Sequence, residues 1–526
     1  MPRTALRLLA LLLVLSPALL QAEEPVDLEM VSRIRDEGYR RSQVVETVRH
    51  LTEGIGARLT GSPAMKEANE WTRRKLEEWG LENAHLEPYE FGRGWTFSRA
   101  SVALLRPVEM PLQALPKAWT PGTEGPVRGQ LMVAELDAEE DFEKHRGKVA
   151  GKVLLLAAER DLLKNPRQTR PRRHSEEDLQ KILEYEAPAE ESDSTNAAAL
   201  QRVRFRRALN RFLTDEKVLA VIDTSSNDWG LLRAGRAGSF EPGENVGVPT
   251  VVLGAEQYNR LHRMVSAGRE AEVEIDVRAR FLDEDRNAYN TIAEIPGTDR
   301  KGEIVLIGAH LDSWHAGTGA TDNAAGSAVA MEAIRILQAL GVKPRRTIRI
   351  GLWSGEEQGL LGAQAYVTQH LGSRPEPTDP DLKDLAPYRR GAAAGPFRAR
   401  PEHARLSVYF NLDNGGGRIR GIYTEENAAV VPIFEAWMRP LRDLGVTTVT
   451  MDKTGATDHV PFDAVGIPGF QFIQDGLDYT GFTHHTNADT FDHLEPDDLK
   501  QAAVVMATFL YHAAMRPERL PRKHTP

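Results

Sequence analysis

The 526-residue sequence contains no cysteine. Disulfide bonds, thiolate metal ligands and a cysteine nucleophile are therefore excluded, and so is a lipid-anchored bacterial secretion signal, which needs a cysteine after its cleavage site. A chain of this length without disulfides must draw its stability from a large buried core.

The sequence also lacks an excess of basic residues. Its 66 Lys and Arg are outnumbered by 76 Asp and Glu, which gives a formal net charge of −10. Because binding to a phosphate backbone requires a basic face, we expect no nucleic-acid partner. The charge does not restrict peptide substrates, and 41% hydrophobic with 27% charged residues is typical of a globular protein.

Long apolar runs are missing except at the start of the chain. Arg3 supplies a positive charge, residues 5–15 are apolar apart from Arg7, and Ala22 offers a small residue for cleavage. We therefore predict a secretory signal peptide over residues 1–22. The alternative of an uncleaved anchor is disfavoured because the run is short for a span. No stable membrane insertion is expected after signal removal, and the predicted location is secreted or periplasmic.

The length predicts two or three folding units, and the character of the sequence changes twice along the chain. Helices are expected over 28–53 and 63–80. Short β-like runs then lie between turns, with strands expected at 130–133, 152–156, 218–222 and 250–253. We assign 106–284 to an inserted β-rich domain. Within it, the charged segment 163–216 is interpreted as a solvated helical insertion or a mobile flap, and a role as a gate has no support beyond position.

From about residue 287 onward, strand and helix patterns alternate. The expected strands are 289–295, 303–309, 347–353, 406–412 and 469–473, and the expected helices are 324–340, 359–369, 428–444 and 496–514. This order predicts an α/β fold with a mostly parallel central sheet covered by helices on both faces. The predicted catalytic domain is discontinuous, over 23–105 and 285–526, and the Pro/Gly/Ala-rich stretch 373–401 is expected to be a surface loop.

Polar side chains follow the strands of this predicted sheet, where ligands of α/β proteins gather. They are His310 and Asp312, Asp322, Glu356 and Glu357, Asp413, and His484 and His485. Each residue alone has an ordinary explanation, since Asp322 is a good helix cap and a carboxylate after a strand is often only a loop residue. Together they suit zinc, which takes imidazole nitrogen and carboxylate oxygen.

We assign the metal ligands as two pairs joined by one bridging carboxylate. His310 and Asp413 are expected to bind one zinc ion, Glu357 and His485 the other, and Asp322 both, which gives two zinc ions per chain. Such a pair of ions lowers the pKa of water between them and orients it for attack.

The neighbouring polar residues are expected to assist. Glu356 cannot readily share a metal with Glu357, so we expect it to act as the general base. Asp312 can accept the second imidazole proton of His310, and Asp489 could do so for His485. His484 is interpreted either as a donor to the developing oxyanion or as a packing residue.

The motifs around these residues resemble the co-catalytic zinc peptidases, which include bacterial leucyl aminopeptidases and glutamate carboxypeptidase. The resemblance is carried by His310–Trp314, Gly319–Gly326, Trp353–Gly359, Asp413, Thr457–His459 with Phe462, and His485–Thr486 with Asp489. It covers roughly residues 40–100 and 285–515 and implies a zinc aminopeptidase-like fold and an exopeptidase acting on peptide substrates. It further implies that the inserted domain is protease-associated-like, although the segments 163–216 and 373–401 depart from the family pattern.

Three alternatives remain at this stage. A true carboxypeptidase would need a cationic group for the substrate carboxylate, and the sequence does not single one out among its arginines. A glutaminyl cyclase-like enzyme would use a single zinc, which the presence of both His310 and Glu357 disfavours. A non-catalytic, receptor-like protein would lack metal ligands, and none is missing here. The sequence leaves open a homodimer, the side-chain preference and the choice of zinc over cobalt or manganese.

Overall fold

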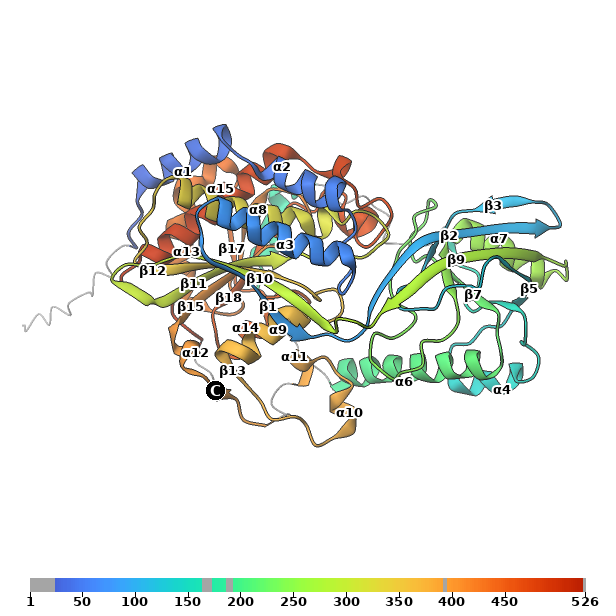
Figure 1. The fold of residues 1–526 in the computed structure, drawn as a ribbon. Helices are drawn as coiled ribbons and strands as arrows, with labels where there is room; N and C mark the ends of the chain where they lie inside the picture. Colours follow the sequence, from blue (N-terminus) through green and yellow to red (C-terminus); the bar gives the residue numbers. More distant parts are fainter. Residues whose placement is uncertain (1–23, 163–172, 186–192, 391–394, 524–526) are drawn as a thin grey trace, which may run out of the picture.

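The structure is a computed structural model that describes residues 24–162, 173–185, 193–390 and 395–523. These residues form two lobes, each built on its own eight-stranded sheet (Figure 1). The signal peptide predicted over 1–22 lies outside the described residues. Within the described ranges, no helix combines the length and the apolar character needed to cross a bilayer.

The larger lobe contains a mixed sheet whose central strands run parallel. Four of its seven strand pairings are parallel, namely β12–β11, β11–β15, β15–β18 and β16–β17. The strand order is β1 (Glu82–Glu90), β10 (Asn287–Ile295), β12 (Arg346–Trp353), β11 (Arg300–His310), β15 (Leu406–Asn411), β18 (Gly469–Gln474), β16 (Ile419–Tyr423) and β17 (Thr448–Thr450). The carboxyl ends of β12, β11, β15 and β18 therefore meet at one edge of the sheet, where such folds bind ligands.

Helices cover both faces of this sheet, which confirms the predicted fold class (Figure 1). Side chains alternate along β11, because Val305 and Ile307 enter one core while Ile304 and Leu306 enter the other. The first face carries α1 (Leu28–Arg40), α2 (Val44–Arg49), α3 (Pro63–Glu78), α8 (Ala325–Ala339), α13 (Val431–Met438) and α15 (Pro496–Met515). The second face carries α9 (Leu361–Tyr366) and α14 (Val460–Asp463).

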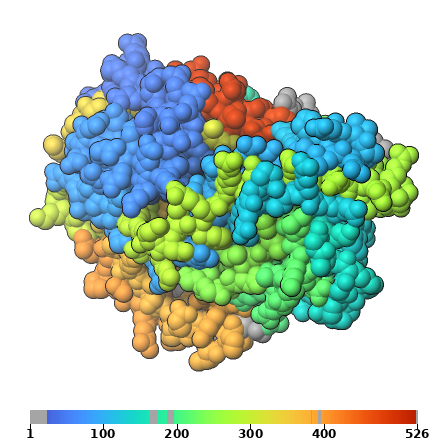
Figure 2. All heavy atoms as spheres, turned by 45° about the vertical axis from the view of Figure 1, so that its right-hand side comes forward, coloured from blue at the N-terminus to red at the C-terminus, as the bar shows by residue number. Residues whose placement is uncertain are grey.

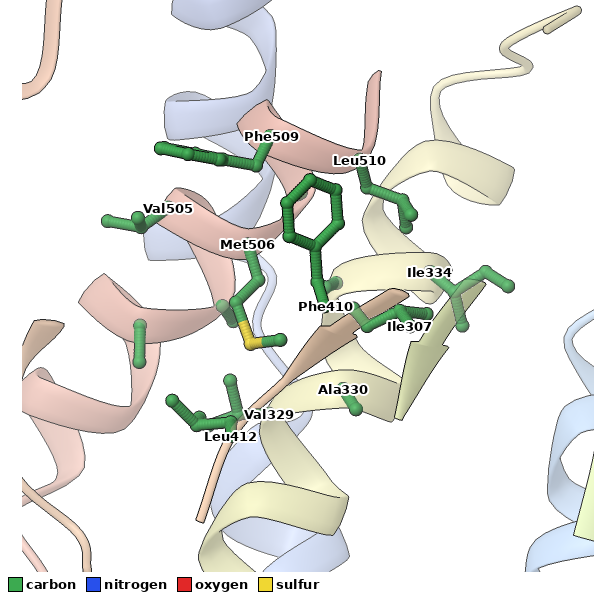
Figure 3. Close-up of a cluster of buried hydrophobic side chains, with 14 of the residues drawn as sticks. Ile307, Val329, Ala330, Ile334, Phe410, Leu412, Val505, Met506, Phe509 and Leu510 are labelled. Carbon is green, nitrogen blue, oxygen red and sulfur yellow. The ribbon is translucent and has the colours of Figure 1, made fainter. Parts of the chain in front are cut away.

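The core under the first face is dense and almost wholly apolar. Phe410 of β15 and Ile307 of β11 point toward α15 and α8, where they meet Met506, Leu510 and Ile334 (Figure 3). Full burial of each such side chain contributes about 1.5–3 kcal/mol. This packing fixes the strand ends that carry the polar residues.

The first helical segment differs from the expectation of one helix over 28–53. It is divided into α1, α2 and a short helical turn η1 (His50–Ile55). The break falls at Ser42, whose hydroxyl accepts a hydrogen bond from the Val44 amide at 3.3 Å and starts the second helix. The following helix α3 begins as its sequence predicts, with Ser62 accepting from the Met65 amide and Pro63 in the first turn.

The smaller lobe has a second mixed sheet with its own hydrophobic core. Its strand order is β3 (Met110–Leu112), β2 (Gly94–Arg106), β9 (Glu272–Leu282), β5 (Val127–Val133), β6 (Val153–Leu155), β7 (Ala220–Thr224), β8 (Thr250–Leu253) and β4 (Ala114–Pro116). Its helices are α4 (Phe142–His145), α6 (Asp193–Asp215) and α7 (Ala255–Ser266). The helix α5 (Glu176–Leu183) packs instead against β17 of the larger lobe, where the Thr450 hydroxyl donates to the Ile182 carbonyl oxygen. Strand β2 belongs to this sheet, so the sheet begins within the range 23–105 that we assigned to the catalytic domain.

The first and last long strands of the smaller lobe, β2 and β9, join the larger lobe side by side. Gly94 pairs with Leu282 at the base of the long β2–β9 ribbon, and Glu90 pairs with Asn287 just inside the larger lobe. Between these pairs, the Arg93 guanidinium donates to both carboxylate oxygens of Asp283, at 2.7 and 2.9 Å. Two adjacent strands thus join the lobes here, and the segment 173–185 makes further contacts with the larger lobe.

The two segments that depart from the family pattern contain regular structure. The charged segment 163–216 includes α5 and α6, while residues 163–172 and 186–192 lie outside the described residues. The stretch 373–401 includes α10 (Pro380–Lys383), α11 (Pro387–Arg390) and β14 (Arg398–Ala399), and residues 391–394 are outside the described ranges. Figure 1 shows α10 and α11 beside one end of α6.

Candidate active site

The strand ends of the larger lobe bring the predicted metal ligands together. His310 is the last residue of β11, Glu357 lies four residues beyond β12, and Asp413 lies two residues beyond β15. Asp322 lies in the short helical turn η5 (Ala320–Ala324) that leads into α8, and His485 lies in the loop after β18. Five side chains from distant parts of the sequence thus occupy one site.

The Asp322 carboxylate lies between the two histidines. Its Oδ1 atom is 3.3 Å from Nε2 of His310, and its Oδ2 atom is 3.2 Å from Nε2 of His485. On the outer sides, His310 Nε2 lies 3.1 Å from Asp413 Oδ1, and His485 Nε2 lies 2.9 Å from Glu357 Oε2. The site therefore has two halves, each with one imidazole and one outer carboxylate, joined by a single carboxylate.

The adjacent glutamates Glu356 and Glu357 point to different halves. Glu357 contacts His485, whereas Glu356 forms a group with His310 and Asp413 in which ligand atoms lie within 4.8 Å of one another. A second such group joins Asp322 with His484 and His485. Because their side chains point to different halves, Glu356 and Glu357 can have different roles in the site.

The site stabilises positive charge. Burial lowers the pKa of His310 and His485, but the surrounding carboxylates reverse this, raising the pKa of His310 well above its ordinary value and that of His485 to about 10. Burial raises the pKa of Glu357 to about 7 and that of Glu356 well above its usual range. The carboxylates are therefore too crowded to ionise freely unless a cation lies among them.

Asp312 contacts both the first strand end and the two glutamates. Its Oδ1 atom lies 3.5 Å from Nδ1 of His310, whose ring nitrogen is also 3.1 Å from the Asp312 carbonyl oxygen. The carboxylate accepts hydrogen bonds from the amides of Glu356 and Glu357, each at 3.3 Å, and from the Thr60 hydroxyl at 3.0 Å. Asp312 thus links the position of His310 to that of the turn that carries Glu356 and Glu357, which we call the glutamate turn.

Asp489 does not contact His485 as the sequence suggested. Its carboxylate accepts hydrogen bonds from the Thr321 amide and hydroxyl, at 2.6 and 2.8 Å, and from the Asp322 amide at 3.2 Å. The expectation of a contact with His485 was wrong because the Asp489 side chain binds the turn that carries Asp322. Asp489 therefore orients Asp322.

A buried arginine that the sequence did not single out supports the same turn. The Arg58 guanidinium is fully buried and donates to the carbonyl oxygens of Leu51, Gly56, Leu311, Thr318 and Gly319. Its charge faces Asp489, Asp312 and Asp322, while burial lowers its pKa to about 10. The glycine-punctuated loop 54–61, which brings the backbone close to this site, was the available signal.

Asp458, like Arg58, was not assigned a role from the sequence, although it lies within the motif Thr457–His459. Neither carboxylate oxygen has a hydrogen-bond partner among the described residues, and the side chain is fully buried. Burial raises the pKa of Asp458 well above its ordinary value, with Asp413 and Asp312 adding to the shift. This position favours the uncharged form of Asp458.

The smaller lobe contributes to the loop that carries the two histidines. Arg233 donates to the His484 carbonyl oxygen at 3.1 Å and lies 2.9 Å from Nδ1 of His485. The Ala234 amide donates to the His485 carbonyl at 3.0 Å, and Leu232 and Asn487 exchange hydrogen bonds at 2.7 and 3.1 Å. These contacts hold His485 at a φ of 62°, a left-handed conformation that typically costs about 1–3 kcal/mol for a residue other than glycine.

His484 lies at the edge of the site. Its Nε2 atom is 3.7 Å from Asp322 Oδ2, and its ring lies 3.7 Å from that of His485, centroid to centroid. Burial and the adjacent His485 lower the pKa of His484 to about 4. The ring is therefore neutral at physiological pH and retains one N–H donor.

Comparison with known proteins defines the class. Residues 290–510 match the profile of Peptidase family M28. With the gathered histidines and carboxylates, the chain is a metallo-exopeptidase.

The similar proteins extend the comparison over both lobes. Carboxypeptidase Q of Mus musculus is 25% identical over 501 residues, which cover 95% of this chain and 90% of that protein. The crystal structure of a peptidase M28 precursor from Shewanella amazonensis has a TM-score of 0.66 at 24% identity, covering 95% of this chain and 99% of that one. A zinc aminopeptidase from Bacillus subtilis has a TM-score of 0.57 at 19% identity, covering 95% and 98%. Both structures share the fold.

Proposed function

We propose that the chain is a two-zinc exopeptidase that hydrolyses peptide bonds at the ends of short peptides or of dipeptides. The observation that carries this proposal is the position of Asp322, whose two carboxylate oxygens face His310 and His485 at 3.3 and 3.2 Å. One carboxylate presented in this way to two imidazoles, each with its own outer carboxylate, suits a pair of adjacent cations.

His310, Asp413 and Asp322 would hold one zinc ion, and His485, Glu357 and Asp322 the other. Two buried carboxylate atoms fit this assignment, since Asp322 Oδ2 and Glu357 Oε1 have no hydrogen-bond partner among the described residues. The raised pKa values of both histidines support it further, because they indicate a strongly negative potential. Zinc is favoured over other metals by the mixed imidazole and carboxylate ligands and by the zinc aminopeptidase that shares the fold.

When bound, zinc supplies a Lewis acid that polarises the peptide carbonyl and lowers the pKa of water. Glu356 accepts a proton from the attacking water and returns it to the nitrogen of the leaving amine. Its placement supports this role, because Glu356 lies in the His310 half of the site, and burial keeps its pKa well above that of an exposed glutamate.

Two further residues assist in this proposal. Asp312 holds the His310 ring and the glutamate turn through the contacts described above. His484 donates its N–H to the developing oxyanion, which its neutral state and its position beside Asp322 support. Carboxypeptidase Q and the bacterial aminopeptidases provide the precedent for an exopeptidase reaction in this family.

The test is an assay of the purified, zinc-loaded protein on free dipeptides, dipeptides blocked at the amine, and longer peptides. Hydrolysis of free dipeptides that stops when the amine is blocked supports an aminopeptidase or dipeptidase, whereas unaffected hydrolysis identifies a carboxypeptidase. Metal analysis should give two zinc ions per chain, and one ion with cyclisation of amino-terminal glutamine would favour the cyclase alternative. Absence of all peptide hydrolysis would overturn the proposal.

We also infer that the protein is exported to the periplasm or the medium. The apolar run at residues 5–15 and the small Ala22 support cleavage after residue 22. Mass spectrometry of the protein recovered from these compartments should show a chain that starts at Glu23, and an intact amino terminus there would contradict cleavage.

A further inference from the structure

A large cavity of about 860 Å³ lies between the two lobes, on the far side of the glutamate turn. It is lined by α6 of the smaller lobe, by the segment around Phe240 and by the α10–α11 segment of the larger lobe. In Figure 2 the α10–α11 region, in orange, meets the green surface of the smaller lobe along the lower side of the molecule. Arg207 of α6 joins the two sides through an ion pair of 2.8 Å with Asp384.

The cavity is strongly basic in a chain that is acidic as a whole. Seven basic and four acidic side chains line it, an excess of three positive charges, whereas the whole chain carries −10. Such a reversal of charge inside a cleft concentrates anions there.

Two of these arginines, Arg206 and Arg236, form no ion pair with a carboxylate in the part of the chain that the structure describes. Both are partly buried, and Arg236 lies 5.0 Å from the ring centroid of Phe240. Burial lowers the pKa of both, and the repulsion between them lowers that of Arg236 further, to about 10. An anion placed between the two guanidinium groups would remove this repulsion and could accept paired hydrogen bonds.

The cavity is connected to the metal site by the turn that carries the glutamates. Gln358, which follows Glu357 directly, lines the cavity, and both polar atoms of its side-chain amide are buried without a hydrogen-bond partner among the described residues. A row of aromatic rings runs alongside. It passes from Phe240 to Trp119, Trp314 and His485 with centroid distances of 5.2, 6.3 and 6.1 Å. Gln358 and this row of ring contacts thus link the lining of the cavity to residues of the metal site.

We propose that Arg206 and Arg236, with Gln358, bind the free carboxylate at the carboxyl terminus of the peptide substrate. The proposal rests on the proposed peptidase function and specifies its substrate class as short peptides with an unblocked carboxyl terminus. The guanidinium groups bind the carboxylate, and the Gln358 amide serves the peptide group next to it. Arg206 comes from the smaller lobe and Gln358 from the larger, so both lobes are needed to bind the substrate.

The first test compares leucyl-leucine with leucyl-leucinamide, which lacks the terminal charge. The zinc-loaded wild type should show a kcat/KM for the free acid roughly 10- to 100-fold above that for the amide, as expected for a charged hydrogen-bonded contact. In the double variant Arg206→Gln, Arg236→Gln this ratio should fall to about one, mainly through a higher KM for the free acid. Arg211→Gln, an exposed arginine on the same helix, is the matched control and should keep the wild-type ratio. A merely structural loss would lower kcat/KM for both substrates and leave the ratio unchanged, which would overturn the proposal.

The second test separates this inference from the proposed function. Calorimetric binding of leucyl-leucine and its amide is measured on Glu356→Gln protein with and without the two arginine substitutions. A preference for the free acid that disappears with the arginines supports the cavity as the carboxylate site, even if the wild type hydrolyses no peptide. Equal affinity for acid and amide, or no binding of either, would refute the carboxylate site, even if the wild type is an active peptidase.

Discussion

At the residue scale, the chemistry centres on one carboxylate with two imidazole neighbours. Asp322 is held from behind by Asp489, which accepts from its amide, and the charge of Arg58 faces both acids. Although burial favours its neutral form, the neighbouring imidazoles of His310 and His485 lower the pKa of Asp322 well below its ordinary value. These imidazoles and Asp489 therefore fix the orientation of Asp322.

The variant Asp322→Ala should lose both metal ions together, because a single side chain faces both halves of the site. We expect the zinc content to fall from two ions per chain to near zero after dialysis against buffer that contains trace zinc. Inductively coupled plasma mass spectrometry measures this content, with Asp458→Asn as a neighbouring variant that should retain zinc. Retention of one ion in Asp322→Ala would refute the bridging role.

The variant Glu356→Gln should keep its zinc and lose nearly all activity. The amide preserves the shape of the side chain but cannot accept the proton, so kcat should fall roughly 100- to 10 000-fold. Steady-state hydrolysis of a free dipeptide, together with zinc analysis of the same sample, checks the result. Turnover close to wild type would remove Glu356 as the base.

The gathering of these side chains could be predicted from the sequence because most of them follow a recognisable strand. His310, Asp413 and the glutamate pair could be placed from strand periodicity and the meeting of parallel strand ends. Arg58 and Arg233 could not, since both act across long sequence separations, and Arg233 comes from the other lobe. Asp489 was given the wrong partner because its distance from Thr321 depends on the path of a loop that has no periodic pattern.

At the element scale, a partly buried charge cluster joins β1, β12 and the helices below the sheet. His370 Nε2 lies 3.0 Å from Glu87 Oε2, and its Nδ1 atom lies 3.6 Å from Glu402 Oε2. Arg349 of β12 completes the cluster, 2.5 Å from Glu402. Although burial opposes it, the two carboxylates raise the pKa of His370 to about 9.

This cluster predicts a pH-dependent contribution to stability. The folded-state pKa of His370, about 9, exceeds the unfolded value of about 6.5, so its contribution is complete below pH 6.5 and is lost as pH rises through 9. His370→Gln should lower the free energy of unfolding by about 1–2 kcal/mol at pH 6, a value reduced for partial exposure, and by much less at pH 10. Urea unfolding across this range measures it, with His145→Gln as a control whose pKa is not raised. A difference that does not change with pH would contradict the assignment.

Element prediction succeeded where a strand or helix is almost wholly buried. The buried strand β8 and the helix α8 have continuous or strongly periodic apolar patterns, and both lie close to their predicted positions. Strand β2 was not predicted, because Gly94–Arg106 mixes exposed, partly buried and buried positions without regular alternation. Its pairing with β9, about 180 residues later, determines its conformation.

At the scale of the whole molecule, two lobes with separate cores enclose one cavity and share one catalytic loop. The larger core does not depend on the metal site, since the apolar layers around α8 and α15 are extensive (Figure 3). Removal of metal should therefore abolish activity without unfolding the chain.

Chelation with dialysis should leave the far-ultraviolet circular dichroism unchanged while the melting temperature falls by several degrees. The loss has two sources, since ligand binding stabilises the folded state and the crowded carboxylates repel one another without cations. Differential scanning calorimetry of zinc-loaded and chelated protein measures the shift, and restoring zinc should reverse it. Collapse of the helical signal on chelation would show instead that the metals hold the fold together.

The contact between Leu232–Ala234 and the His485 loop limits how the protein can diverge. The strands β2 and β9 lie side by side, which favours exchange of the smaller lobe at the level of the gene, but α5, encoded between them, packs on the larger lobe. The loop that carries His485 also forms hydrogen bonds with three residues of that lobe, Leu232, Arg233 and Ala234. A homologous lobe that replaced this one would therefore need its own equivalent of Leu232–Ala234. A substitution in that segment would likewise require a compensating change in the loop that carries His485.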